Sequence, residues 1–319
     1  LGIDSVWLPE YHFIPVSVLS SPIAVASSIA SRTKKMRIGF GVYLLPLANP
    51  IRIAEEVATL DHISNGRVEF GIGRGTFPEH HDAFNSPYPE SRTRFDEYLE
   101  IILKAWTEQD VTFNGNHYSC QNIRVKPKPI QKPHPPIWVP GTGRPATVAW
   151  ASANRYTYAA FLTELTRART LFDSYREHAN KAGWEPESDK FAFMICAHVN
   201  ETDAKAQESG KAFMWRMGHP LKGPREYWAP PGYFSQAGVT ANAARRQKPM
   251  NEMSYEELQE HNHLVVGSPD TVIKKLRHIK ETLGIGSLLL ETQGGPLSHK
   301  DTMRSIKLMG EEVIPALQD

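Results

Sequence analysis

The sequence predicts an α/β fold of the (β/α)8 TIM-barrel type. Runs rich in β-branched and aromatic residues alternate with helical runs, and this alternation favours parallel strands joined by right-handed crossovers. Seven strands are expected, and a first strand absent from this sequence would make eight. The 319 residues suit a single barrel domain over 1–319, since such barrels take about 250 residues plus insertions.

The expected elements follow one another in a regular order. Strands are expected at residues 5–9, 37–44, 67–72, 137–140, 157–161, 191–199 and 287–291. Helices are expected at residues 22–32, 50–63, 91–106, 145–153, 164–182, 203–217, 269–283 and 299–314. The boundary between the second helix and the third strand is marked by Asn65-Gly66. A left-handed residue commonly ends a helix, and glycine adopts that conformation without strain.

Two stretches interrupt this order. Residues 111–136 contain a dense proline tract, which excludes helix and central strand and predicts an extended connection on the outside. Residues 218–262 form a long insertion between the last two expected strands. Insertions of this length in a compact domain are usually functional, so we expect a mobile lid, with a subunit contact as the alternative.

Composition excludes several classes of partner. Lys and Arg number 36 against 35 Asp and Glu, and this balance gives no basic footprint for nucleic acid or an anionic membrane. The uncharged segment 13–31 is rich in serine and proline, so a buried helix is expected there and not a membrane span. Two cysteines, Cys120 and Cys196, cannot form a metal cluster and suit the cytoplasm. A small-molecule substrate is expected.

Polar residues leave the expected strands at the barrel end where active sites lie. Arg74 follows the third strand between glycines that keep the backbone bare, and an arginine fork suits a phosphate. The loop Gly141-Thr142-Gly143-Arg144 leads into a helix that begins at Pro145, and exposed N–H groups there suit an anion. Two phosphate-binding loops are therefore predicted at one rim.

Other polar groups allow weaker interpretations. His80-His81-Asp82 could ligate a metal, but adjacent histidines point in different directions, so a polar loop and no metal site are expected. Glu10 and Glu291 could form the carboxylate pair of a barrel glycosidase, although the sequence does not give their separation.

Four ordered motifs resemble the bacterial luciferase-like flavin monooxygenases. They are the run 7–13, the block 39–75, the proline-rich strap 127–139, and the ending 266–269 with 313–315. The resemblance covers nearly the whole chain apart from 218–262. It implies a (β/α)8 barrel that binds reduced FMN, with Arg74 on the FMN phosphate, N–H groups from residues 141–144 beside it, and Glu55 organising the flavin site. It also implies an unusual peptide bond at about Gly41-Val42, supporting the isoalloxazine ring.

The resemblance implies a two-component FMN-dependent monooxygenase, a homo-oligomer (a dimer) that receives FMNH2 from a separate NAD(P)H:flavin reductase. O2 would give a C4a-(hydro)peroxyflavin that oxygenates a small organic substrate, with His12 and Tyr11 as proton donors or orienting groups. Tyr11 replaces one of two luciferase histidines, and Gly73 stands where luciferase has a reactive cysteine, so light-emitting chemistry is not implied.

Three points stay open at this stage. An F420-dependent dehydrogenase of the same superfamily is one alternative, although F420 users usually lack an arginine like Arg74. A flavin-binding barrel without turnover is the other. The substrate, and the choice between hydroxylation, Baeyer–Villiger insertion and C–S or C–N cleavage, cannot be inferred from the residues.

Overall fold

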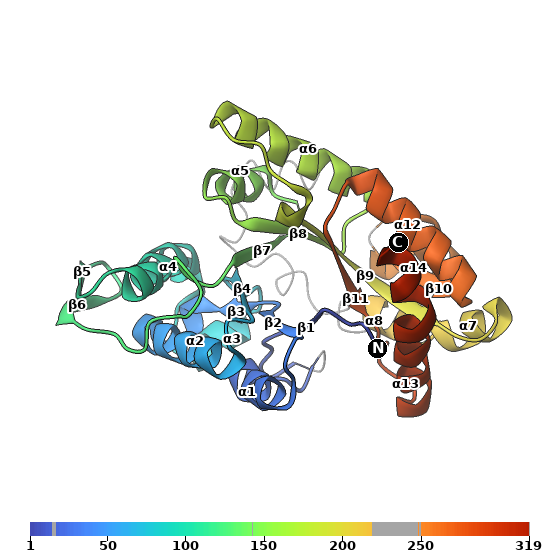
Figure 1. Cartoon of the computed structure of the whole chain (residues 1–319), viewed down its shortest axis with the longest axis horizontal. Helices are drawn as coiled ribbons and strands as arrows, with labels where there is room; N and C mark the ends of the chain where they lie inside the picture. Colours follow the sequence, from blue (N-terminus) through green and yellow to red (C-terminus); the bar gives the residue numbers. More distant parts are fainter. Residues whose placement is uncertain (15–16, 142, 219–247, 249, 319) are drawn as a thin grey trace. The chain divides into compact units, whose positions relative to one another are not determined.

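A computed structural model of the chain describes residues 1–14, 17–141, 143–218, 248 and 250–318 (Figure 1). The chain divides into two compact units. The N-terminal unit contains the described parts of Asp4–Trp138. The C-terminal unit contains Leu1–Ile3 and the described parts of Val139–Lys222 and Asn242–Asp319. Among these residues we find no helix with the length and apolar character that a bilayer crossing requires.

The N-terminal unit is built on parallel strands. They are β1 (Ser5–Leu8), β2 (Arg37–Phe40), β4 (Val68–Gly73) and the start of β7 (Ile137–Gly141), hydrogen-bonded in that order, while the short β3 (Tyr43–Leu44) also pairs with β4. The expected strand 37–44 is thus divided at Gly41-Val42, where the peptide bond is cis, as the resemblance implied.

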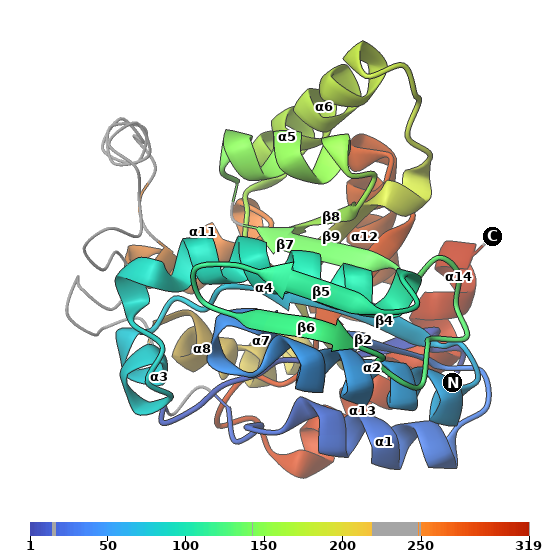
Figure 2. The same cartoon turned by 90° about the vertical axis from the view of Figure 1, so that its left-hand side faces the viewer.

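Three of the four helices of this unit pack on one another (Figure 2). The four are α1 (Pro22–Arg32), α2 (Pro50–Ser64), α3 (Pro78–Ala83) and α4 (Ser91–Thr107), with α1 packed on α2 and α2 on α4. Helix α2 begins where the Asn49 side chain accepts N–H groups from the first turn, and it ends at left-handed Asn65 followed by Gly66, as predicted. Trp106, fully buried, donates from Nε1 to the Ala54 carbonyl oxygen at 2.9 Å and fastens α4 to α2.

Residues 111–136 were expected to be an extended connection, but their first part forms an antiparallel hairpin that was not predicted. Strands β5 (Val111–Asn114) and β6 (Ser119–Ile123) form their own two-stranded sheet before the proline tract. The tract is fastened to α2 because the Gln131 backbone N–H and side-chain amide both donate to the buried carboxylate of Asp61, at 2.9 and 2.8 Å.

The C-terminal unit continues the parallel pattern from β7 to β8 (Thr157–Phe161) and β9 (Phe191–Val199), and both β10 (Leu264–Gly267) and β11 (Ser287–Glu291) pair with β9. Its helices are α5 (Pro145–Ala153), α6 (Leu165–Lys181), α7 (Asp203–Gly210), α8 (Phe213–Gly218), α11 (Tyr255–Glu260), α12 (Pro269–Leu283), α13 (His299–Leu308) and α14 (Ile314–Gln318). Helices α5 and α6 lie side by side (Figures 1 and 2).

Three expectations about this unit need correction. Strand β10 was missed, and with it the described residues form a sheet of nine strands, because the expected strand 37–44 is divided into β2 and β3. The insertion therefore lies between β9 and β10 and not between the last two strands. The helix expected at 203–217 is broken after Gly210, whose Cα is packed so closely that a Cβ would lie 2.6 Å from the Tyr255 hydroxyl. The last helix contains a π-helical turn at Met309–Val313. Residues 219–247 and 249, most of the expected lid, lie outside the described residues.

Candidate active site

Arg74 leaves β4 at its carboxyl end, where the sequence placed it. The side chain is half-buried, and its Nη1 donates to the hydroxyl of Ser91, the first residue of α4, at 3.4 Å. Gly75 follows with a φ of 83°, and a Cβ there would lie 3.2 Å from His81 Nε2. A left-handed glycine and a buried histidine therefore hold the turn that presents the Arg74 guanidinium.

Gly71 and Gly73, which precede Arg74, allow close packing between strands and do not leave the backbone bare as predicted. A Cβ at Gly71 would lie 1.8 Å from the Phe40 carbonyl oxygen, and a Cβ at Gly73 would lie 2.4 Å from the Val42 side chain. The space that these two glycines leave is filled by β2 and by the segment after the cis peptide bond. Their smallness thus packs one strand against the next, and it does not open the backbone to a ligand.

The exit of β1 forms a polar network around Glu10. Glu10 Oε2 accepts the Leu44 backbone N–H at 2.8 Å, and Glu10 Oε1 lies 3.1 Å from His12 Nε2. Both side chains are about nine-tenths buried, and this burial raises the pKa of Glu10 despite its hydrogen bonds. One carboxyl group thus joins His12 to the backbone of β3.

His80 and His81 belong to α3 and not to the polar loop that we expected. Both are almost fully buried, and α3 packs against the 3-10 turns at Leu45–Leu47 and Tyr88–Glu90. The His12 backbone N–H donates to His80 Nε2 at 3.4 Å, while His80 Nδ1 is buried with no hydrogen-bond partner among the described residues. Burial lowers the pKa of His80 to about 4, with a smaller effect from His12, so His80 is neutral at pH 7.

A second network lies on α2 beside these residues. Glu56 Oε2 lies 3.1 Å from the Tyr43 hydroxyl, and Glu56 Oε1 accepts from Arg52 at 2.8 Å. Burial and the nearby Glu56 carboxylate raise the pKa of Tyr43 far above its ordinary value. Sequence reasoning missed Glu56, which makes both of these hydrogen bonds. The role of Glu55 stays a prediction.

The aromatic neighbours of His12 complete this part of the site. Tyr11 is half-buried and meets the edge of Phe77 with ring centroids 6.3 Å apart, and His12 packs against Phe84 at 4.8 Å. Among the described residues, no group of three His, Cys, Asp or Glu side chains is arranged to hold a metal ion.

The second predicted loop follows β7 in the C-terminal unit. Gly143 has a φ of 98°, its carbonyl oxygen accepts from Arg167 Nη2 at 2.7 Å, and Arg144 caps the start of α5. A Cβ at Gly141 would lie 3.0 Å from the Tyr158 hydroxyl. Thr142, also predicted here, lies outside the described residues. The sequence reasoning missed Arg167, which comes from the next helix, α6.

Glu291, at the end of β11, pairs with Arg216. Arg216 Nε donates to Glu291 Oε1 at 2.5 Å, and the buried Cys196 thiol lies 3.7 Å from Glu291 Oε2. Glu10 is likewise committed to His12 and Leu44. Each carboxylate has its own hydrogen-bond partners within its unit.

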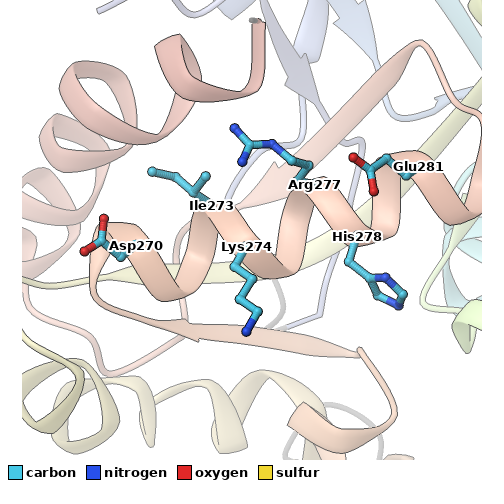
Figure 3. Close-up of a pocket in the computed structure, with 6 residues that line it drawn as sticks. All are labelled: Asp270, Ile273, Lys274, Arg277, His278 and Glu281. Carbon is cyan, nitrogen blue, oxygen red and sulfur yellow. The ribbon is translucent and has the colours of Figure 1, made fainter.

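An open hollow of about 440 Å³ lies on the outer side of α12 (Figure 3). Asp270, Ile273, Lys274, Arg277, His278 and Glu281 line it, all from this one helix. Their charges are mixed, and Figure 3 shows the six side chains spreading outward in different directions. This surface carries no candidate chemistry.

Comparison with known proteins assigns the family. Residues 1–286 match the profile of the Luciferase-like monooxygenase family. The chain belongs to this family. It is 23% identical to the alkanal monooxygenase alpha chain of the Kryptophanaron alfredi symbiont, over 100% of this chain and 89% of that protein.

Solved structures of other proteins share the fold of this luciferase-like monooxygenase. The oxygenating constituent of 3,6-diketocamphane monooxygenase from Pseudomonas putida, in complex with FMN, aligns with a TM-score of 0.79 and 22% identity over 98% of this chain and 89% of that one. An F420-dependent secondary alcohol dehydrogenase aligns with a TM-score of 0.75 and 22% identity over 100% and 91%. The predicted α/β barrel class and the predicted family are confirmed.

Proposed function

We propose that this luciferase-like monooxygenase is the oxygenase component of a two-component system that uses reduced FMN and O2 to oxygenate a small organic substrate. The observation that carries the proposal is Arg74, held half-buried at the carboxyl end of β4 by the Ser91 hydroxyl and the left-handed Gly75. A guanidinium fixed at such a place fits the FMN phosphate. When bound, reduced FMN supplies the reaction with O2.

The residues of the chain would bind and orient the flavin and supply protons. Arg74 would bind the phosphate, and the segment around the cis Gly41–Val42 peptide would support the ring. His12, with Tyr11 beside it, would donate or orient a proton from the network of Glu10. In the loop after β7, the N–H groups of Gly143 and Arg144 at the start of α5 suit an anion.

A separate NAD(P)H:flavin reductase would supply FMNH2. The related camphane enzyme is described as an oxygenating constituent, which supports a divided system. We also retain a homodimer, a cytoplasmic location and a lid over residues 218–262 as proposals.

The specific rival is an F420-dependent dehydrogenase, because one such enzyme shares the fold. The decisive experiment mixes the protein with photoreduced FMN, labelled O2 and a panel of apolar compounds. We expect one labelled oxygen atom in an organic product. A parallel reaction replaces FMN and O2 with oxidised F420. The dehydrogenase would be selected if the first reaction releases only hydrogen peroxide and the second shows substrate-dependent reduction of F420.

His12 provides a second test of the proposal. Replacing His12 with Gln should lower product formed per flavin oxidised, by roughly 100-fold, while FMN affinity stays the same, since a proton donor acts in the transition state. An unaltered yield would place His12 among residues that only support the fold.

A further inference from the structure

Glu10 connects two parts of the N-terminal unit, the exit of β1 and strand β3, through one carboxyl group. Its two oxygens have separate partners, the Leu44 N–H at 2.8 Å and His12 Nε2 at 3.1 Å. The Glu10 side chain is 10% exposed and that of His12 is 9% exposed, so water does not compete freely for these bonds. Burial of a carboxyl group opposes its ionisation, and hydrogen bonds must offset this cost in free energy.

The arrangement dictates where the His12 proton lies. The Leu44 N–H occupies Oε2, so only Oε1 faces the imidazole, and an ionised carboxylate can only accept a hydrogen bond. Nε2 must then carry the ring proton. His12 Nδ1 has no hydrogen-bond partner among the described residues and is left as the bare nitrogen.

His80 fixes the other side of His12 without adding charge. It accepts the His12 backbone N–H and stands edge-on to the His12 ring, with centroids 5.5 Å apart and planes at 87°. The other charged groups that act on Glu10 and His80 are Glu56, Glu79 and His81. The His12 backbone and ring are therefore held from two elements, α3 and the exit of β1.

We propose that Glu10 is a positioning residue that sets the tautomer and the ring orientation of His12, so that Nδ1 is presented to the reacting groups. The catalytic part of this inference rests on the proposed function, in which His12 serves the monooxygenase reaction. The tautomer itself does not depend on that function. A carboxylate that orients an imidazole through one ring nitrogen leaves the other nitrogen to do the chemistry.

Glu10→Gln tests the inference with little change of shape. The Leu44 N–H still needs an acceptor, so the amide oxygen should face Leu44 and the amide NH2 should face His12. His12 Nε2 must then accept, and the ring should change to the Nδ1–H tautomer. Glu56→Gln is the matched control, since it makes the same charge change on a residue that contacts Tyr43 and Arg52.

The readout is ¹⁵N NMR of the ring nitrogens at pH 8.5 in the full chain, with His12 identified among the 13 histidines by a His12→Gln sample. We expect Nε2–H in the parent and in Glu56→Gln, and Nδ1–H in Glu10→Gln. Nδ1–H in the parent, or Nε2–H in Glu10→Gln, overturns the inference. Where the variant does not fold, Nδ1–H in the parent alone still overturns the inference.

Turnover separates this inference from the proposed function. Glu10→Gln should lower coupled product formation roughly 100-fold, with FMN affinity changed less than about twofold. A loss no larger than that in Glu56→Gln overturns the positioning role. If the parent oxygenates no compound while the tautomer changes as expected, the proposed function has failed and the assignment of the tautomer to Glu10 stands.

Discussion

Two loops of this chain look alike in sequence and are held in different ways. Each follows a parallel strand and combines glycines with an arginine, Arg74 after β4 and Arg144 after β7. Behind the first loop lie packed strand glycines and the buried imidazole of His81. Behind the second lies a guanidinium, that of Arg167, bound to the Gly143 carbonyl oxygen.

The difference teaches that glycine-rich motifs do not report ligand binding by themselves. In the first loop, Gly71 and Gly73 are demanded by the neighbouring backbone and by Val42, and only Gly75 is required by its backbone conformation. In the second loop, Gly143 is left-handed and faces a flexible side chain. The first loop is supported by closely packed strands and by a buried histidine, His81, whose pKa is lowered by burial, whereas the second is supported by a guanidinium that keeps its charge.

Gly71→Ala should have the largest effect on this contrast. Its Cβ would meet the Phe40 carbonyl oxygen at 1.8 Å, so the strands must separate, and we expect a loss of at least about 4 kcal/mol of unfolding free energy in urea. Gly143→Ala meets the movable end of Arg167, and with left-handed strain should cost about 1–2 kcal/mol. Gly183→Ala, which has the same strain in open space, is the control. Equal losses at 71 and 143 would remove the contrast.

Acid should weaken α3, the helix that carries both His80 and the His81 behind the first loop, and it should leave the charge of Arg167 behind the second loop unchanged. Burial lowers the pKa of His80 from 6.5 to about 4, so the folded state prefers the neutral ring; this stability is complete above pH 6.5 and is lost as the pH falls toward 4. The loss is roughly 3 kcal/mol. His80→Asn, which cannot titrate, should lose that much less stability between pH 7 and 4 in urea unfolding. Parallel curves for the parent and the variant would show that His80 is readily protonated in the fold.

The arginines themselves distinguish the loops as ligand sites. Arg74→Ala should weaken FMN binding about 10- to 150-fold, because a charge-assisted contact contributes about 1.5–3 kcal/mol, while riboflavin, which has no phosphate, binds both proteins alike. Arg92→Ala, which removes the same charge from the exposed face of α4, is the control. Arg144→Ala measures the second loop in the same fluorescence titration. Unchanged FMN affinity in Arg74→Ala would refute the phosphate assignment.

The fold could be predicted wherever the signal is local. The strands at 157–161, 191–199 and 287–291 and the helices at 22–32, 145–153 and 269–283 have the expected bounds. Strand β10 was missed because four apolar residues after a long insertion carry no period of their own. The break after Gly210 was missed, and the close approach of Tyr255 to Gly210 could not be predicted either, because Tyr255 is distant in the sequence.

The site residues, too, could be predicted only where the signal in the sequence is local. The structure places Arg74 at the end of β4, and Tyr11 and His12 soon after β1, as the sequence predicted, because a position after a strand is local information. Their roles in binding and catalysis stay predictions. The burial of His80 and His81 could not be predicted, because it comes from the packing of α3 and makes a polar pair part of the interior. Arg167 and Glu56 were missed for a related reason: each acts on a partner in another element, and local spacing does not encode such contacts.

Arg167→Met should give the smallest effect and decides whether the second loop has any part in binding. The variant keeps most of the side-chain volume but loses the 2.7 Å bond from Nη2 to the Gly143 carbonyl oxygen. We expect a cost of about 1 kcal/mol, seen as a roughly fivefold weaker FMN affinity if the N–H groups of this loop face the phosphate. Arg169→Met, an exposed residue of the same helix, is the control. Lower thermal stability with unchanged FMN affinity would mean that Arg167 only holds the fold, and the two loops would then differ in function as well as in support.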